Sequence, residues 1–166
     1  MSMLKWIAQG AGFALFASGI GFFSMAPAYH YLEPGEGLLR LSISHAGQIV
    51  GACRDRSPEE LAKLPRNMRA LQDCPRERSP VTVELELDGR LLHHEAVPPS
   101  GLSRDGASTV YRRFPLRAGE HRLTVRLNDS ARIPGFNYQR SELIQLRPGQ
   151  VLVIDFNPQQ GGVLIK

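Results

Sequence analysis

Two cysteines and two adjacent histidines are the residues of this chain best suited to chemistry. Cys53 and Cys74 are its only cysteines, and such a pair can form a disulfide, bind a metal ion or act in redox chemistry. Their separation matches neither a metal-ligand motif nor C-x-x-C, which favours a structural disulfide. His93 and His94 are neighbours in an extended segment, so their side chains should point to opposite faces. One metal ion is therefore not expected to bind both unless a bulge intervenes.

Met68 and His45 add to this set of soft donors, which suit copper. Nothing in the spacing brings the donors together, so we keep metal handling as an alternative interpretation. Nucleophilic catalysis needs a base beside the nucleophile and a third group that orients the base. No G-x-S-x-G or equivalent turn marks out such a serine. We therefore expect neither enzymatic activity nor a cofactor.

The segment between the two cysteines predicts a short helix. Ser57 can cap the helix, Pro58 suits its first position, and Glu60 completes a capping box. Pro65 should stop the helix, which we expect over Pro58–Leu64. So short a helix is marginal in isolation, and a disulfide that closes a loop of about 22 residues contributes about 3 kcal/mol in the chain-entropy model. We expect this bond to hold the helix against a β domain.

Charged residues cluster in this segment and just after it. The basic residues are Arg54, Arg56, Lys63, Arg66, Arg69, Arg76 and Arg78, and acidic residues are interspersed among them. One interpretation is a solvated surface whose salt bridges contribute little. The other is a docking face, because arginine is enriched at interfaces and a disulfide-closed loop loses little entropy on binding. In the second interpretation, Arg66, Met68 and Arg69 are candidate partner-binding residues.

A disulfide needs an oxidising compartment, and the N-terminal segment supplies a route to one. Residues 6–23 contain no charge, and about 20 residues suffice to cross a bilayer as a helix. Lys5 lies just before them, which by the positive-inside rule places the N-terminus in the cytoplasm. We expect residues 1–28 to form a single-pass anchor, in contact with membrane lipid, in a bacterial inner membrane. The C-terminal domain would then lie in the periplasm.

The alternative is a cleaved signal peptide and a soluble periplasmic or secreted protein. Residues 26–28 match the small-x-small cleavage pattern and would leave Tyr29 as the first mature residue. Against this, the apolar run exceeds the usual h-region of about 7–15 residues. Small residues also recur four apart, as in packed membrane helices, in the pairs Ala8–Gly12, Gly10–Ala14 and Ala17–Gly21. Gly12, Ala17 and Gly21 are thus candidate contacts with a partner helix, unless they only reflect the composition of such segments.

Length and charge limit the other possibilities. The chain has 166 residues, which allows one domain with a hydrophobic core besides the N-terminal segment. The net charge is +4, but 16 acidic residues lie among 20 basic ones and only 7% of the residues are aromatic. This composition argues against a nucleic-acid partner.

After a linker at residues 29–37, residues 38–166 predict a domain of short strands. Residues 81–87 alternate strictly between apolar and polar, and Asp88-Gly89 follows at once as a hairpin signal. Other strands are expected at 39–44, 49–52, 90–97, 110–116, 123–127, 142–146 and 151–156, with brief pairing or fraying at 163–165. Because residues 151–156 are apolar except for Asp155, we expect this strand to be central and buried on both faces. The whole is the pattern of an antiparallel β-sandwich, with residues 53–74 as a helical excursion.

Between Val110 and Phe156, strands alternate with Ala-Gly or Pro-Gly turns that lie beside charged residues, as at 117–120 and 147–149. These units resemble those of PEGA-type and other immunoglobulin-like extracytoplasmic modules. The resemblance implies an immunoglobulin-like fold and carries no functional residues.

These features favour a non-enzymatic accessory protein, anchored by one helix. Its β-sandwich would contact a larger membrane-embedded or periplasmic protein complex. The alternative from a different class is a periplasmic metal-handling or small-ligand-binding protein that uses His93, His94 or Met68. A soluble secreted domain is a third possibility if the leader is cleaved.

Overall fold

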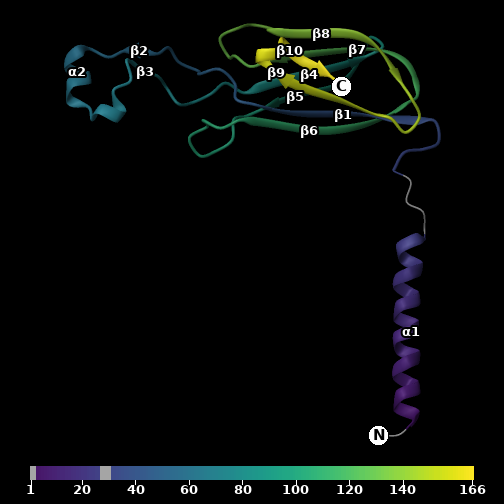
Figure 1. Cartoon of the computed structure of the whole chain (residues 1–166). Helices are drawn as coiled ribbons and strands as arrows, with labels where there is room; N and C mark the ends of the chain where they lie inside the picture. Colours follow the sequence, from purple (N-terminus) through teal and green to yellow (C-terminus); the bar gives the residue numbers. More distant parts are fainter. Residues whose placement is uncertain (1–2, 27–30) are drawn as a thin grey trace. The chain divides into compact units, whose positions relative to one another are not determined.

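The computed structural model describes residues 3–26 and 31–166, and the chain divides into two compact units, Met1–Glu33 and Pro34–Lys166. In the first unit, helix α1 spans Met3–Met25 and contains no buried residue (Figure 1). It is long and apolar enough to cross a membrane, a description that an anchor and a signal sequence both meet. Residues 27–30 lie outside the described residues, and with them most of the expected cleavage site and the start of the expected linker.

The second unit contains two four-stranded sheets and a two-stranded ribbon. The strand order is β10-β9-β1-β6 in the first sheet and β5-β4-β7-β8 in the second, and β2 pairs with β3 in the ribbon. The strands are β1 (Glu36–His45), β2 (Arg54–Asp55), β3 (Gln72–Asp73), β4 (Val81–Leu87), β5 (Arg90–Val97), β6 (Ser108–Arg117), β7 (Gly119–Asn128), β8 (Tyr138–Leu146), β9 (Val151–Asn157) and β10 (Gly162–Ile165). The helices are α2 (Pro58–Lys63) and the 3₁₀ turns η1 (Arg66–Met68) and η2 (Pro158–Gln160).

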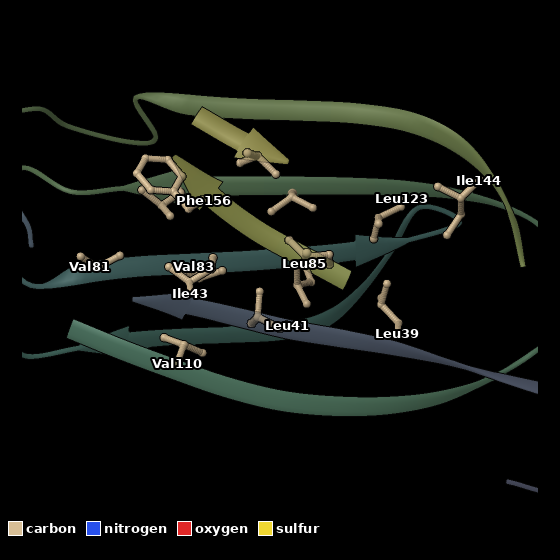
Figure 2. Close-up of a cluster of buried hydrophobic side chains, with 14 residues drawn as sticks. Leu39, Leu41, Ile43, Val81, Val83, Leu85, Val110, Leu123, Ile144 and Phe156 are labelled. Atoms are coloured by element: carbon tan, nitrogen blue, oxygen red, sulfur yellow. The ribbon is translucent and has the colours of Figure 1, made fainter. Parts of the chain in front are cut away.

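The two four-stranded sheets share one hydrophobic core, which Figure 2 shows between β1 and β4. Val81, Val83 and Leu85 of β4 are fully buried, while the residues between them are only half-buried. Leu39 and Leu41 of β1 are fully buried on the facing sheet. Each such side chain contributes roughly 1.5–3 kcal/mol by leaving water, so the alternation that predicts these strands also builds the core.

The expected hairpin is confirmed. Asp88 and Gly89 have φ angles of 51° and 79°, as a two-residue turn between twisted antiparallel strands requires. The pairing of β4 with β5 shifts between Leu85 and Glu86, which makes a β-bulge on β5. Beyond the bulge, His93 lies opposite Leu85.

The expectation of purely antiparallel sheets is wrong at one place. β1 pairs with β9 in parallel, with Leu38 opposite Val151 and Leu41 opposite Ile154. Parallel neighbours cannot be joined by a hairpin, and here the whole second sheet lies between the two strands in sequence. Turn spacing reveals only local hairpins, so it gave no sign of this long-range pair.

The expected return strand at residues 49–52 is also wrong. Ile49 forms a single bridge with Arg78 instead of a hairpin with β1. Val50 N donates to Glu77 O at 3.0 Å, so this segment pairs with residues that follow the second cysteine.

Strand limits and burial differ from expectation elsewhere. β1 begins at Glu36, inside the expected linker, and β8 begins at Tyr138 because it pairs with β7 along its whole length. β9 is central in its sheet, as expected, but only one of its faces is buried: Ile154 is fully buried while Val151 is 44% exposed. β10 pairs with β9 rather than fraying.

One ion pair closes the β4–β5 turn against β7. His121 Nδ1 lies 2.7 Å from Asp88 Oδ2, and His121 Nε2 lies 2.8 Å from the carbonyl oxygen of Arg117. Both ring nitrogens face acceptors, chiefly Asp88, so the pKa of His121 is raised above its ordinary value. The bond from His121, together with the backbone N–H of Arg122, lowers the pKa of Asp88.

We predict a pH-dependent contribution from this pair. The raised pKa of His121 gives stability that is complete below about 6.5 and is lost as pH rises through its folded value. The lowered pKa of Asp88 gives stability that is complete above about 3.9 and is lost as pH falls through its folded value. His121→Gln should therefore lower the urea midpoint of the detergent-solubilised protein most near pH 5.5 and least near pH 9. A loss that is the same at both pH values would contradict the assignment.

Candidate functional site

Residues 53–74 form a closed arm that stands out from the two sheets (Figure 1). The expected disulfide between Cys53 and Cys74 is confirmed, with the two Cα atoms 4.2 Å apart. Directly inside it, Arg54 pairs with Asp73 and Asp55 with Gln72 to make the ribbon of β2 and β3. α2 and η1 lie beyond this ribbon, so the disulfide closes the arm at its base.

The short helix of the arm begins as the sequence predicts. Ser57 Oγ accepts a hydrogen bond from Glu60 N at 3.3 Å, and Glu60 Oε2 accepts one from Ser57 N at 2.9 Å. This is the capping box, and it satisfies backbone donors that a helix start leaves open. The bond from Ser57 and a further one from Arg54 lower the pKa of the Glu60 carboxyl. The helix ends at Lys63, one residue before the expected Leu64, which serves as its C-cap.

Arg56 organises the interior of the arm. Its backbone N–H donates to Leu71 O at 2.9 Å, and its guanidinium donates to Asp73 Oδ1 at 2.9 Å and Ala70 O at 3.4 Å. Arg54, on β2, donates to Glu60 of α2 at 2.9 Å. Arg56 thus joins the two sides of the arm, and Arg54 joins the ribbon to the helix. Both side chains serve the structure of the arm and are not free for docking.

No residue of the arm is buried. The expectation that the disulfide holds the helix against the sheets is therefore wrong. A helix this short is marginal without a hydrophobic support, but a covalent closure, a capping box and arginine bonds replace that support here. The order of the arm depends on these bonds, since burial of apolar surface contributes little to it.

A neck of two antiparallel segments, residues 47–50 and 76–79, joins the arm to the sheets. Ser79 N donates to Gln48 O at 2.7 Å, next to the bridge between Ile49 and Arg78. Arg78 NH1 donates to Gly47 O at 3.0 Å. A Cβ added to Gly47 would lie 2.2 Å from Ser79 O, so only glycine allows the two segments to approach this closely.

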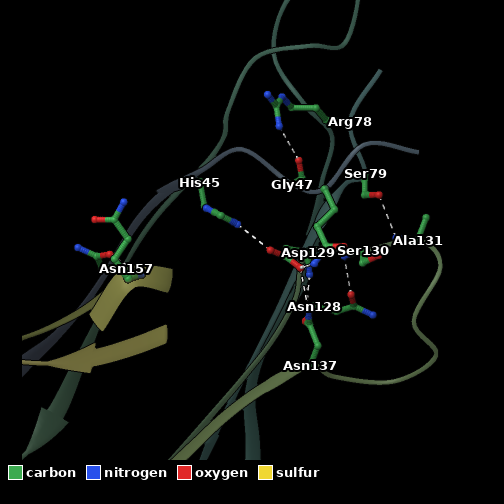
Figure 3. Close-up of polar contacts among 12 residues, drawn as sticks. His45, Gly47, Arg78, Ser79, Asn128, Asp129, Ser130, Ala131, Asn137 and Asn157 are labelled. Carbon is green, nitrogen blue, oxygen red and sulfur yellow. Dashed lines mark hydrogen bonds and ion pairs between the residues drawn. The ribbon is translucent and has the colours of Figure 1, made fainter. Parts of the chain in front are cut away.

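The neck is fastened to the sheets through the buried carboxylate of Asp129 (Figure 3). Its oxygens lie 2.8 Å from His45 Nε2, 2.6 Å from Asn137 Nδ2 and 3.2 Å from Gln48 Nε2. The Asp129 carbonyl oxygen also accepts from Gln48 N at 2.7 Å. Asp129 thus links the end of β1, the neck and the β7–β8 loop. The sequence places Asp129 only in a loop, and nothing in its local spacing indicates these distant partners.

The tip of the arm, residues 61–71, brings together the candidate partner-binding residues Arg66, Met68 and Arg69. Met68 is 60% exposed and the neighbouring Leu71 is 74% exposed. Arg69 is exposed, and its Nε donates to Leu64 O at 2.9 Å, which fixes the turn at η1. The tip is thus a small exposed surface of apolar and basic side chains.

His93 and His94 lie on β5, whereas Met68 lies at the tip of the arm. His93 lies 3.1 Å from Glu95 and its ring centroid is 5.6 Å from that of Phe114, on the inner side of β5. His94 lies on the outer side, 3.3 Å from Glu84. Both cysteines are joined in the disulfide, and within residues 3–26 and 31–166 no three or more His, Cys, Asp or Glu side chains are grouped to hold a metal ion.

The small residues of α1 lie on two faces of the helix. At 3.6 residues per turn, Gly10, Ala14, Ala17 and Gly21 follow one another along one face. Gly12 lies on the opposite side, in a shallow hollow lined by Gln9, Phe13 and Phe16. The candidate contacts Gly12, Ala17 and Gly21 therefore do not share one face, and a single partner helix would contact Ala17 and Gly21 or Gly12, but not all three.

Comparison with known protein families, with curated proteins and with solved structures found no match to this chain.

We predict that removing the disulfide disorders the arm and spares the sheets. The neck already holds residues 53 and 74 close together, so the bond restricts the folded state little and the unfolded chain strongly. Cys53→Ser/Cys74→Ser should lower the free energy of unfolding by about 3 kcal/mol and Tm by about 10 °C. Arm amides should lose protection from hydrogen exchange, while the far-UV spectrum of the sheets stays. Two reactive thiols in wild-type protein isolated without reductant would contradict the bond itself.

Proposed function

We propose that this protein is a non-enzymatic accessory protein of a larger membrane-embedded or periplasmic complex. α1 anchors it in a bacterial inner membrane, the sheet domain lies in the periplasm, and the disulfide-closed arm contacts a partner protein. We also propose that the two sheets are an immunoglobulin-like sandwich with one parallel strand pair.

The observation that carries this proposal is the arm. It is ordered by a disulfide, a capping box and arginine bonds, yet no residue of it is buried. A segment with this exposure contributes little to the core of its own domain. Its preorganisation lowers the entropy lost on binding, which is a recurrent feature of rigid recognition loops.

Within the second unit, strand β1 shows from which end of the sheets the arm leaves. β1 begins at Glu36, where the chain arrives from the anchor, and it ends at His45, next to the neck. A ten-residue strand of this kind is roughly 33 Å long. The arm thus leaves the sheets at the end opposite to the one where the anchor's linker joins (Figure 1). An arm that leaves the sheets there is accessible to a partner protein, since none of its residues is buried.

Two features support a periplasmic location of the sheet domain. α1 meets the length and composition of a membrane span, and the exposed disulfide is stable only where thiols are oxidised. The glycines and alanines of α1 offer a second contact with the same complex, through a partner helix on the face of Ala17 and Gly21.

We predict the topology as follows. A reporter fused after Lys166 should be active only outside the cytoplasm, and the intact protein should keep the mass of its full sequence and resist carbonate extraction. Release of a soluble species that begins at Tyr29 would show that the N-terminal segment is a cleaved signal peptide.

We predict that the arm, rather than the sheet surface, contacts the partner. A photo-crosslinking amino acid placed at Met68 in the full-length protein should give a protein adduct in intact cells. The same probe at Leu143, which is 54% exposed on β8, serves as the matched control and should give none. An adduct at Leu143 with none at Met68 would show that the docking surface lies on the sheet and not on the arm.

A further inference from the structure

The charges of the arm are segregated along its length. Its carboxylates are Asp55, Glu59, Glu60 and Asp73, all in the ribbon or the first turn of α2. Of these, Glu60 and Asp73 are bonded to Arg54 and Arg56, and Asp55 to Gln72. Three of the four carboxylates are thus bonded within the arm, from the ribbon or the first turn of α2.

The tip contains basic residues and no acidic ones. Lys63, Arg66 and Arg69 lie within residues 61–71, where the sequence has no Asp or Glu. Within the described chain no ion pair joins any of the three to a carboxylate, and only Arg69 uses part of its guanidinium, on Leu64 O. The strongly exposed Met68 and Leu71 lie between and beside these cations.

From this arrangement we propose that the tip of the arm binds an acidic segment of a partner protein, one that offers several carboxylates around an apolar side chain. Arginine suits such a segment because its planar guanidinium can accept a carboxylate in two parallel bonds. Met68 and Leu71 supply the apolar contact, and methionine adapts readily to the shape of a partner. The inference rests on the proposed function, since it specifies the partner of the same arm.

An anionic membrane surface is the other chemistry that attracts exposed cations beside apolar side chains. The composition of the tip favours protein instead. Basic clusters that bind anionic lipid commonly contain about 4–8 Lys or Arg, whereas the tip contains Lys63, Arg66 and Arg69. Two of these are arginines, which suit carboxylates of a protein in paired bonds.

The test uses the full-length protein with the photo-crosslinker at Leu71, and identifies the adduct and its linked peptide by mass spectrometry. We expect a protein peptide rich in Asp and Glu. Lys63→Glu/Arg66→Glu/Arg69→Glu should lower the adduct yield at least about tenfold, which three weak surface pairs together can account for. The matched control, Arg90→Glu/Arg132→Glu/Arg147→Glu, makes the same charge change at exposed positions outside the arm and should keep the yield.

A second variant, Lys63→Glu/Arg66→Glu, leaves the bond from Arg69 to Leu64 intact, and an intact disulfide verifies that each variant arm is closed. Lysines in place of the acidic residues of the linked peptide should restore the adduct of the charge-reversed arms. An unchanged yield in both reversal variants would overturn the acidic partner and leave docking by the arm in place. Adducts with lipid alone, or none at any arm position, would overturn the proposed function as well.

Discussion

The buried carboxylate of Asp129 is the contact on which the position of the arm depends. An isolated carboxylate away from water is costly unless its oxygens are bonded, and here His45, Asn137 and Gln48 all supply partners. Each partner comes from a different part of the chain: the end of β1, the β7–β8 loop and the neck. Because the cost of leaving this charge unpaired is high, the cluster holds the three parts in one arrangement. The side chain is only 4% exposed, so water cannot readily replace a lost partner.

The second unit therefore uses two kinds of stabilisation in two places. Between the sheets, apolar side chains such as Leu41 and Leu85 are fully buried, and the hydrophobic effect dominates. In the arm nothing is buried, and order comes from the Cys53–Cys74 bond and from directional polar contacts. Asp129 lies at the boundary and transmits the rigidity of the sheets to the neck. An arm built in this way is firm at its base while its tip keeps its side chains in solvent.

The parts of this structure that could be predicted from the sequence are those with a local cause. The capping box at Ser57, the hairpin at Asp88-Gly89 and the alternation of β4 each depend on residues within one turn or strand. The parallel pairing of β1 with β9 and the bonds of Asp129 join residues far apart in sequence, and no local pattern encodes them. The candidates Arg66, Met68 and Arg69 could be placed together from the sequence because a disulfide and two prolines confine them to one short loop. Asp129 was missed as an anchoring residue because a loop aspartate usually serves only its own turn.

The same contrast explains why the charges of the arm divide as they do. Arginines at its base must compensate for the absent core, and each needs a carboxylate within reach, so Arg54 and Arg56 are matched by Glu60 and Asp73. The tip has no such requirement, since Pro65, the 3₁₀ turn η1 and the bond from Arg69 to Leu64 already shape its backbone. Within the described residues, Lys63 and Arg66 form no ion pair with a carboxylate, and repulsion among the three cations of the tip opposes the fold of the arm slightly. This cost is physically reasonable if the tip binds an opposite charge on a partner. The same holds for the apolar side chains that the tip leaves in water.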